Sequence, residues 1–194
     1  MRKTVVVKNG LYLLIALAPS IVLASPYLGV SIEPTIKKSS VETHYQFLNE
    51  TPEDSSLAFG LNGGYRFDYG TLDNFGFEIG YKYLDVSDSA MSNRDLKLGY
   101  TAHQYLMKPT YYYTINQQSD LKVGMGLSYS TYDFESSLNQ TKKSLTKNGF
   151  GVITTLGIES DVTDNLTLGV GLFYQVDDIA QSYGFAVGTS YHFL

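Results

Sequence analysis

Large apolar residues alternate with small or polar residues along most of the chain, and the alternation is most regular near the C-terminus. One side of an extended chain would carry Tyr183, Phe185, Val187, Thr189, Tyr191 and Phe193. The other side would carry Gly184, Ala186, Gly188, Ser190 and His192. Because successive side chains of a strand point to opposite faces, this segment is predicted to be a strand with one large apolar face and one small or polar face.

The same two-faced pattern recurs about eight times, which predicts eight strands in all. The seven earlier ones are expected at about Pro26–Thr35, Leu57–Phe67, Phe75–Leu84, Gln104–Thr114, Leu121–Ser130, Phe150–Ser160 and Leu166–Gln175. The fourth is the least regular, because Leu98 and Tyr100 upstream fall in the opposite phase to Tyr105 and Met107. We expect a β-bulge or a strand start near Thr101–His103, since one extra residue resets the phase.

The connections between these strands are predicted to alternate in length. The longer or more polar ones are Ile36–Ser56, Asp85–Asp95, Thr131–Asn148 and Val176–Gln181. The short ones are Asp68–Asn74, Asn116–Asp120 and Asp161–Asn165. Short periplasmic turns and longer extracellular loops are typical of an outer-membrane barrel, so both termini are expected on the periplasmic side.

The position of glycine separates a membrane barrel from a soluble, lipocalin-like barrel, whose apolar face points inward. Of the 18 glycines, 13 lie on the small-residue face: Gly29, Gly60, Gly64, Gly76, Gly80, Gly124, Gly126, Gly151, Gly157, Gly169, Gly171, Gly184 and Gly188. A crowded lumen requires such a face, and the opposite face carries no charge within the predicted strands. We therefore predict an all-β fold, an eight-stranded antiparallel up-and-down transmembrane β-barrel, with the 17 tyrosines forming interfacial girdles.

The few charges on the small-residue face are nearly balanced and are expected to point into the lumen. They are Glu33, Glu78 and Glu159 against Arg66, Lys82, Lys108 and Lys122. Buried charges must pair or their desolvation cost is not recovered, so we predict a lumen salt-bridge network that plugs the barrel. A narrow, porin-like conduction path through the same residues is the alternative.

The N-terminus has the features of a cleaved secretory signal. Arg2, Lys3 and Lys8 precede an apolar run over Leu11–Leu23, and Ala24 provides a small residue for cleavage. We predict a signal peptide at 1–24 and one barrel domain at 25–194, because the run is too short for a retained membrane helix. The mature chain would keep 11 basic and 19 acidic residues, a net charge of −8 that argues against nucleic acid as a partner.

Several segments together resemble the OmpA-like and OmpX-like family of small outer-membrane β-barrels. They are Tyr27–Ile32, Phe75–Tyr83, Asp161–Gly171 and the aromatic C-terminus, and the resemblance covers the whole mature length. It implies a monomer in the outer membrane of a Gram-negative bacterium after Sec-dependent export, in contact with outer-membrane lipid and lipopolysaccharide. It also implies that Tyr191 and Phe193 form the assembly signal for the barrel-assembly machinery, although Leu194 departs from the usual aromatic last residue.

Candidate chemistry is sparse. The three histidines are His44, His103 and His192, and no spacing of His, Asp or Glu is typical of a metal site. Some barrels of the family are lipid A-modifying enzymes with a Ser and a His close together, and Ser190 and His192 share a face here. Both would lie at the periplasmic end, away from lipid A in the outer leaflet. We therefore expect no enzyme activity, no cofactor and no metal, with a lipid A-modifying enzyme kept as an alternative.

The two longest polar connections remain as carriers of function. Ile36–Ser56 and Thr131–Asn148 combine mixed charge with exposed aromatics such as Tyr45, Phe47 and Phe134. Loops on a rigid scaffold are where binding residues concentrate. We predict a structural or adhesion role at the cell surface through these loops, with a host surface or serum factor as partner. An ordinary solvated loop has the same composition.

Overall fold

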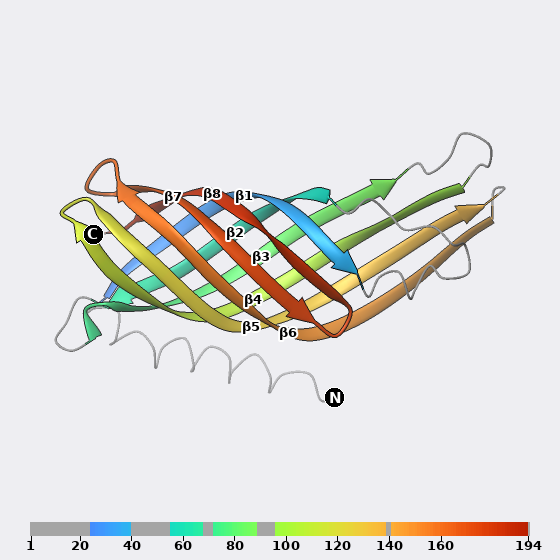
Figure 1. Ribbon diagram of the computed structural model, residues 1–194, viewed down its shortest axis with the longest axis horizontal. Helices are drawn as coiled ribbons and strands as arrows, with labels where there is room; N and C mark the ends of the chain where they lie inside the picture. Colours follow the sequence, from blue (N-terminus) through green and yellow to red (C-terminus); the bar gives the residue numbers. More distant parts are fainter. Residues whose placement is uncertain (1–23, 40–54, 68–71, 89–95, 139–140, 194) are drawn as a thin grey trace, which may run out of the picture.

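In the computed structural model the chain forms one closed barrel of eight antiparallel strands, in the order of the sequence (Figure 1). The structure describes residues 24–39, 55–67, 72–88, 96–138 and 141–193. The strands are β1 (Ala24–Ser39), β2 (Ser55–Phe67), β3 (Phe75–Asp88), β4 (Leu96–Asn116), β5 (Ser119–Leu138), β6 (Thr141–Asp161), β7 (Leu166–Asp177) and β8 (Ala180–His192). The predicted fold class is confirmed. The predicted signal peptide and Leu194 lie outside the described residues.

The barrel closes because β1 pairs with both β2 and β8. Following paired residues from Ile32 through β2 to β5 leads to Asn148 on β6. The opposite path through β8 and β7 leads from Ile32 to Ile158. The two paths end ten residues apart on β6, which is the shear of the closed sheet. Eight tilted strands with this stagger enclose an interior just wide enough for side chains.

The outer surface of the barrel is apolar, as predicted. Large side chains such as Met125, Leu127 and Leu172 are more than 60% exposed, and a protein in water would bury them. The inward positions between them carry the glycines and the charged residues of the small-residue face. A side chain at Gly126 would overlap the carbonyl oxygen of Met107, so the strands approach one another too closely there for any larger residue. No helix long and apolar enough to cross a membrane occurs in the described part of the chain.

The predicted irregularity near Thr101–His103 is wrong. Strand β4 runs without interruption through these residues, and its register shift lies between Thr114 and Asn116. Tyr100 and Ala102 are buried on the inward face, so the strand keeps its phase. Near Thr101 the lumen is lined by apolar side chains. Apolar residues of β4 therefore lie on the inward face before this point and on the outward, lipid-facing side after it.

The predicted long loop at Thr131–Asn148 is also wrong. Strand β5 continues to Leu138 and β6 begins at Thr141, so nearly the whole segment is a β-hairpin. Tyr132 and Phe134 were assigned to a loop, but they are buried inside the barrel. The connection predicted at Val176–Gln181 contracts to two residues between Asp177 and Ala180. Residues 40–54 of the first predicted loop lie outside the described residues.

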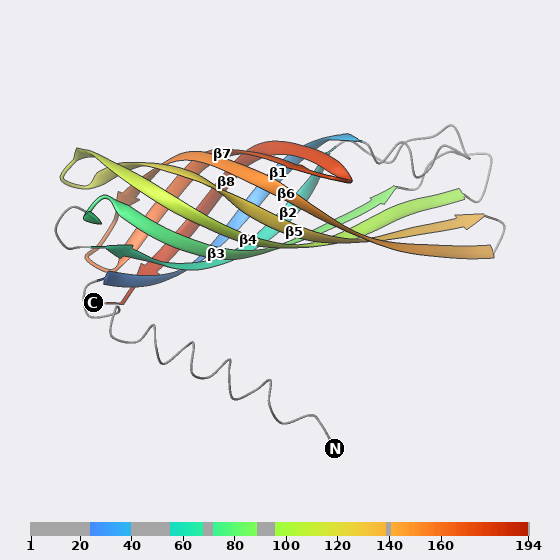
Figure 2. The ribbon, with the colours of Figure 1, turned by 90° about the horizontal axis from the view of Figure 1, so that it is seen from below.

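The strands have unequal lengths, and the difference lies at one end of the barrel. Strands β4, β5 and β6 have 20 or 21 residues, whereas β7 has 12 and β8 has 13. Both described ends of the chain and the β4–β5 and β6–β7 turns lie at the opposite end of the barrel (Figures 1 and 2). A strand needs about 9–11 residues to cross a membrane, so β4, β5 and β6 continue beyond it, and β3 follows β4 as far as the pair of Asp88 and Leu98. Because short turns are periplasmic in outer-membrane barrels, we call the projecting part the extracellular sheet, made of Asp85–Asp88, Leu96–Thr101, Thr131–Leu138 and Thr141–Asn148.

Candidate functional site: the lumen and the extracellular sheet

Glu78 on β3 is the centre of the charged network in the lumen. Its carboxylate oxygens lie 2.6 Å from Lys108 Nζ and 2.8 Å from Lys122 Nζ, and Tyr27 Oη donates a hydrogen bond of 2.7 Å. The three donors come from β4, β5 and β1, so this carboxylate joins strands around the barrel. Glu78 and Lys108 are both buried, so each charge needs the other to offset the cost of leaving water.

Three further ion pairs extend the network along the lumen. Lys122 also contacts Glu159 at 2.7 Å, and Lys82 contacts Glu33 at 2.5 Å. Arg66 pairs with Asp120 and not with one of the three glutamates expected from the sequence. Asp120 was placed in a turn, but it has the same strand parity as Lys122 and Gly124, and that parity could have revealed its inward position.

Aromatic rings cover the cations of the network. Lys82 Nζ lies 3.9 Å from the ring centre of Phe173, and the Arg66 guanidinium lies 4.6 Å from that of Tyr112. Such contacts stabilise a desolvated cation. The sequence pattern did not identify Phe173, a large apolar residue that has the strand parity of Gly169 and Gly171 and is 5% exposed on the inward face.

A cavity of about 140 Å³ lies in the middle of the lumen. Its lining combines the charged residues Glu33, Lys82, Lys108, Lys122 and Glu159 with glycines of β6, β7 and β8. Gly157, Gly169, Gly171 and Gly188 leave that wall without side chains, which makes the space. Polar groups line it, and its size suits ordered water molecules.

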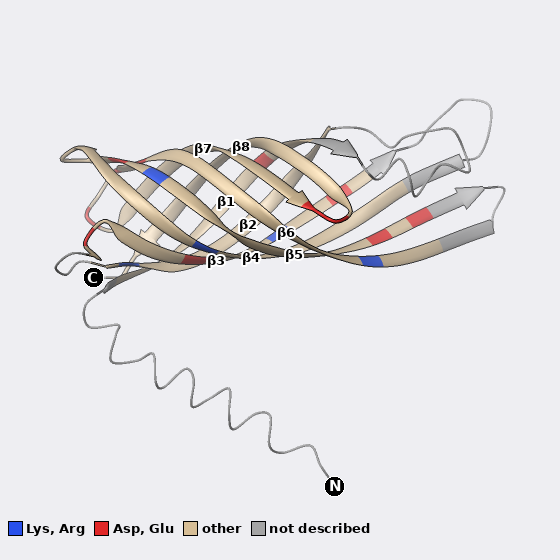
Figure 3. Cartoon of the chain, turned by 60° about the horizontal axis from the view of Figure 1, so that its bottom comes forward, with Lys and Arg blue, Asp and Glu red and all other residues tan. Residues whose placement is uncertain are grey.

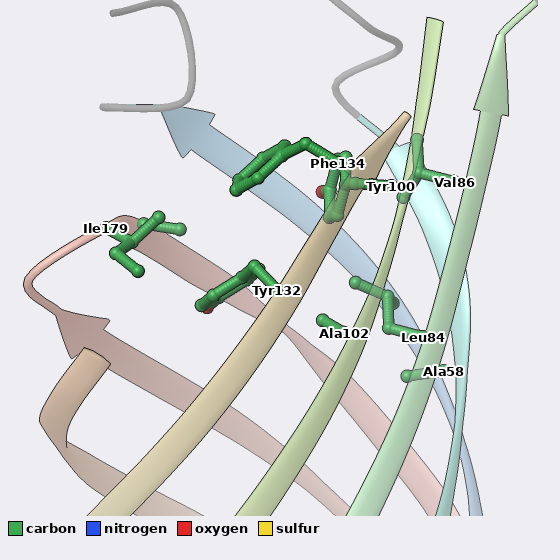
Figure 4. Close-up of a cluster of buried hydrophobic side chains, with 9 residues drawn as sticks. Ala58, Leu84, Val86, Tyr100, Ala102, Tyr132, Phe134 and Ile179 are labelled. Carbon is green, nitrogen blue, oxygen red and sulfur yellow. The ribbon is translucent and has the colours of Figure 1, made fainter. Parts of the chain in front are cut away.

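Buried side chains fill the lumen between this cavity and the extracellular sheet. Tyr132 Oη donates a 2.6 Å hydrogen bond to Asp177, and the other oxygen of Asp177 accepts from the backbone N–H groups of Ile179 and Ala180. Beyond this layer lies a buried apolar cluster, drawn in Figure 4. Its members are Ala58, Leu84, Val86, Tyr100, Ala102, Tyr132, Phe134, Ile179 and Ala180.

The described histidines show no arrangement typical of catalysis. The His192 ring lies 5.3 Å from that of Tyr27, at the end of the barrel where both described ends of the chain lie. No hydrogen bond joins its side chain to Ser190 among the described residues. His103 points outward and its Nδ1 lies 2.7 Å from Tyr81 Oη. His44 lies outside the described residues, and the part of the chain that is described holds no metal-binding group of His, Cys, Asp or Glu.

The outward face of β3 to β6 changes character where the extracellular sheet begins. Tyr81, Tyr105, Tyr129 and Phe150 are paired in one row across the four strands. Four residues further along β3, the row is Asp85, Thr101, Asp133 and Thr146. Aromatic rows mark membrane interfaces, so the acidic row lies on the water side. Figure 3 shows charged residues on the projecting strands as well.

The two aromatic residues at the C-terminal end lie on the outer surface. The rings of Tyr191 and Phe193 are 5.2 Å apart, and both side chains are about half exposed, at 49% and 51%. Both side chains are therefore accessible at the end of the last strand.

A closed, lipid-facing barrel with short turns at one end defines the class of small outer-membrane β-barrels. The family model described as outer membrane protein beta-barrel domain matches residues 11–193, and the chain belongs to this family. It is therefore an outer-membrane protein. No curated protein matches it.

Solved structures share the fold at low sequence identity. Ail, the attachment invasion locus protein of Yersinia pestis, in complex with the heparin analogue sucrose octasulfate, has a TM-score of 0.61 and 12% identity over 88% of this chain and 99% of that one. The outer membrane protein OprG from Pseudomonas aeruginosa has a TM-score of 0.57 and 12% identity over 88% and 96%. A major outer membrane protein from Thermus thermophilus has a TM-score of 0.56 and 9% identity over 87% and 99%. These likenesses concern the fold.

Proposed function

We propose that this protein is a non-enzymatic surface protein that attaches the cell to external macromolecules through its extracellular sheet. The observation that carries the proposal is the length of β4, β5 and β6, which have 20 or 21 residues. About ten residues of each suffice to cross the membrane. The remainder forms a sheet with a polar outward face, held by the barrel, which is the kind of scaffold on which binding residues concentrate.

The lumen fits a supporting role in this proposal. Each lysine of the network has a carboxylate partner within 2.8 Å, and the Tyr132 to Asp177 contact and the apolar cluster lie above it. A packed salt-bridge plug makes the barrel a stable mount for the sheet. Lipid and lipopolysaccharide then surround the apolar wall, and Tyr191 and Phe193 serve as the assembly signal read by the barrel-assembly machinery.

The test removes the outer half of the extracellular sheet and keeps the barrel. Ser87 pairs with Gly99 and Glu135 pairs with Ser144, so residues 88–98 and 136–143 can each be replaced by an Asn-Gly turn. The intact and shortened proteins are displayed on a non-adherent Gram-negative host, and adhesion is measured on cultured cells, on serum-coated surfaces and on heparin. Heparin is included because an analogue of it binds Ail.

The intact protein is expected to confer adhesion on at least one surface, and the shortened protein is expected to lose it. Heat-modifiable migration on gels would verify that both barrels fold. Equal adhesion by both proteins would contradict the proposal. The enzyme alternative would be favoured if neither protein conferred adhesion and a His192→Ala variant lost a lipid A modification that the intact protein makes.

A further inference from the structure

A compact group of aromatic rings lies on the outward face of β3 and β4, where the barrel wall meets the extracellular sheet. Tyr81 lies opposite Tyr105, and the next outward pair along the two strands is Tyr83 and His103. The His103 ring centre lies 5.3 Å from that of Tyr83 and 6.1 Å from that of Tyr81. The Tyr81 and Tyr105 ring centres are 5.5 Å apart, and Tyr81 Oη lies 2.7 Å from His103 Nδ1. These contacts join the rings into one continuous surface.

A carboxylate lies directly beyond the rings. Asp85 is the next outward residue on β3 after Tyr83, because side chains two residues apart share a face of a strand. It is exposed and lies opposite Thr101, and among the described residues its carboxylate forms no ion pair. The other charged side chains described on this face are Asp133 and Glu135, and none of the described ones is a lysine or an arginine. The face therefore attracts cations and repels anions such as lipid phosphates.

The position of this surface identifies what lies against it. The rings continue the lipid-facing wall, in which Ile79 and Met107 are more than half exposed, at 55% and 53%. The next layer outward is that of the lipid headgroups, and Asp85 lies on that side of the rings. Residues two apart on a strand are separated by about 7 Å, so a cation between Tyr83 and Asp85 contacts both. Aromatic faces and a carboxylate are together the groups that hold an ammonium ion.

We propose that Tyr83, His103 and Asp85 form a binding site for an outer-leaflet lipid whose headgroup carries a primary ammonium group. The ammonium lies over the aromatic rings and donates hydrogen bonds to the Asp85 carboxylate, while the acyl chains follow the apolar wall below Tyr81. A quaternary ammonium fits less well, because it has no N–H group to donate. The site faces the membrane, so it lies outside the attachment function proposed above.

The probe is dioctanoyl phosphatidylethanolamine, whose headgroup ends in a primary ammonium. The full barrel is held in non-ionic detergent micelles with EDTA, and native mass spectrometry measures the bound lipid during a titration. The comparison lipids have the same acyl chains and carry choline, glycerol or N-acetylated ethanolamine headgroups. Asp85→Asn removes the charge and keeps the shape of the side chain. Asp73→Asn is its matched control, because it makes the same change at an exposed position before β3, at the other end of the barrel.

Phosphatidylethanolamine is expected to bind more tightly than each comparison lipid. Asp85→Asn should weaken its binding about tenfold, because charge-assisted hydrogen bonds are lost, whereas Asp73→Asn should leave the binding unchanged. Tyr83→Leu keeps an apolar side chain but removes the ring, and it should weaken binding about threefold. Heat-modifiable migration on gels verifies that each variant is folded.

Equal binding of all four lipids, or equal binding by Asp85→Asn and Asp73→Asn, would overturn the proposal and leave an ordinary aromatic girdle. Equal binding of the ethanolamine and choline lipids would overturn the hydrogen bonds assigned to Asp85. A preference for phosphatidylglycerol that appears with Mg²⁺ and disappears with EDTA would overturn the ammonium site in favour of a bridge through a divalent cation.

Discussion

At the scale of single residues, Glu78 is the position where one substitution has the largest expected effect. It accepts from Lys108, Lys122 and Tyr27, and all three donors lose a partner in Glu78→Ala. Lys122 keeps Glu159, but Lys108 is left buried without a carboxylate, which should cost about 3–5 kcal/mol of unfolding free energy. Urea unfolding in lipid vesicles measures this cost. Glu159→Gln is the control with a smaller loss, since Lys122 keeps Glu78. Unchanged unfolding of Glu78→Ala would indicate a wet, loose lumen.

Two neighbouring glycines of β7 give a second prediction at the same scale. A Cβ at Gly171 would lie 2.9 Å from the Leu156 carbonyl oxygen, whereas at Gly169 the nearest atom is Glu159 Cγ at 3.4 Å, beside the cavity. Gly171→Ala should therefore destabilise the barrel by about 1–3 kcal/mol, and Gly169→Ala should be nearly neutral. Urea midpoints of the two variants decide this, and equal midpoints would contradict the close strand approach.

At the scale of elements, the sequence predicts the eight strands and their faces where one face meets lipid and the other meets a small polar lumen. The prediction fails where that contrast is lost. Tyr132 and Phe134 are apolar and inward, so the end of β5 was read as a loop. Phe173 was not assigned either, because it is a large apolar residue that points inward beside Lys82. The partner of Arg66 was missed because Asp120 lies next to a turn, where alternation is too short to assign a face.

The turn between β7 and β8 gives a prediction for an element. Asp177 joins this turn to β5 through Tyr132, and it also caps the N–H groups of Ile179 and Ala180. Asp177→Ala should cost about 1–3 kcal/mol because buried donors lose their acceptor. Tyr132→Phe should cost less, and the double variant should be less than additive because the two side chains share one contact. Additive losses in urea unfolding would show that the contact does not hold the turn.

At the scale of the whole molecule, buried side chains fill the lumen at two levels. The paired charges around Glu33, Lys82 and Glu78 surround the central cavity, and the apolar cluster with Tyr132 lies beyond it. If both levels are packed, the intact protein should show no steady ohmic conductance in planar bilayers. The barrel of the Tyr132→Ala variant should also show no conductance, because the level of paired charges around the cavity remains.

Conductance should appear only when both levels are opened, as in Tyr132→Ala combined with Lys82→Ala. The second change removes the cation that lies over Phe173 and contacts Glu33. The Lys82→Ala single variant is the matched control, and gel migration confirms that each barrel is folded. Steady conductance in the intact protein would contradict the plug and favour a channel. Steady conductance in Tyr132→Ala alone would show that the charged level does not seal the barrel.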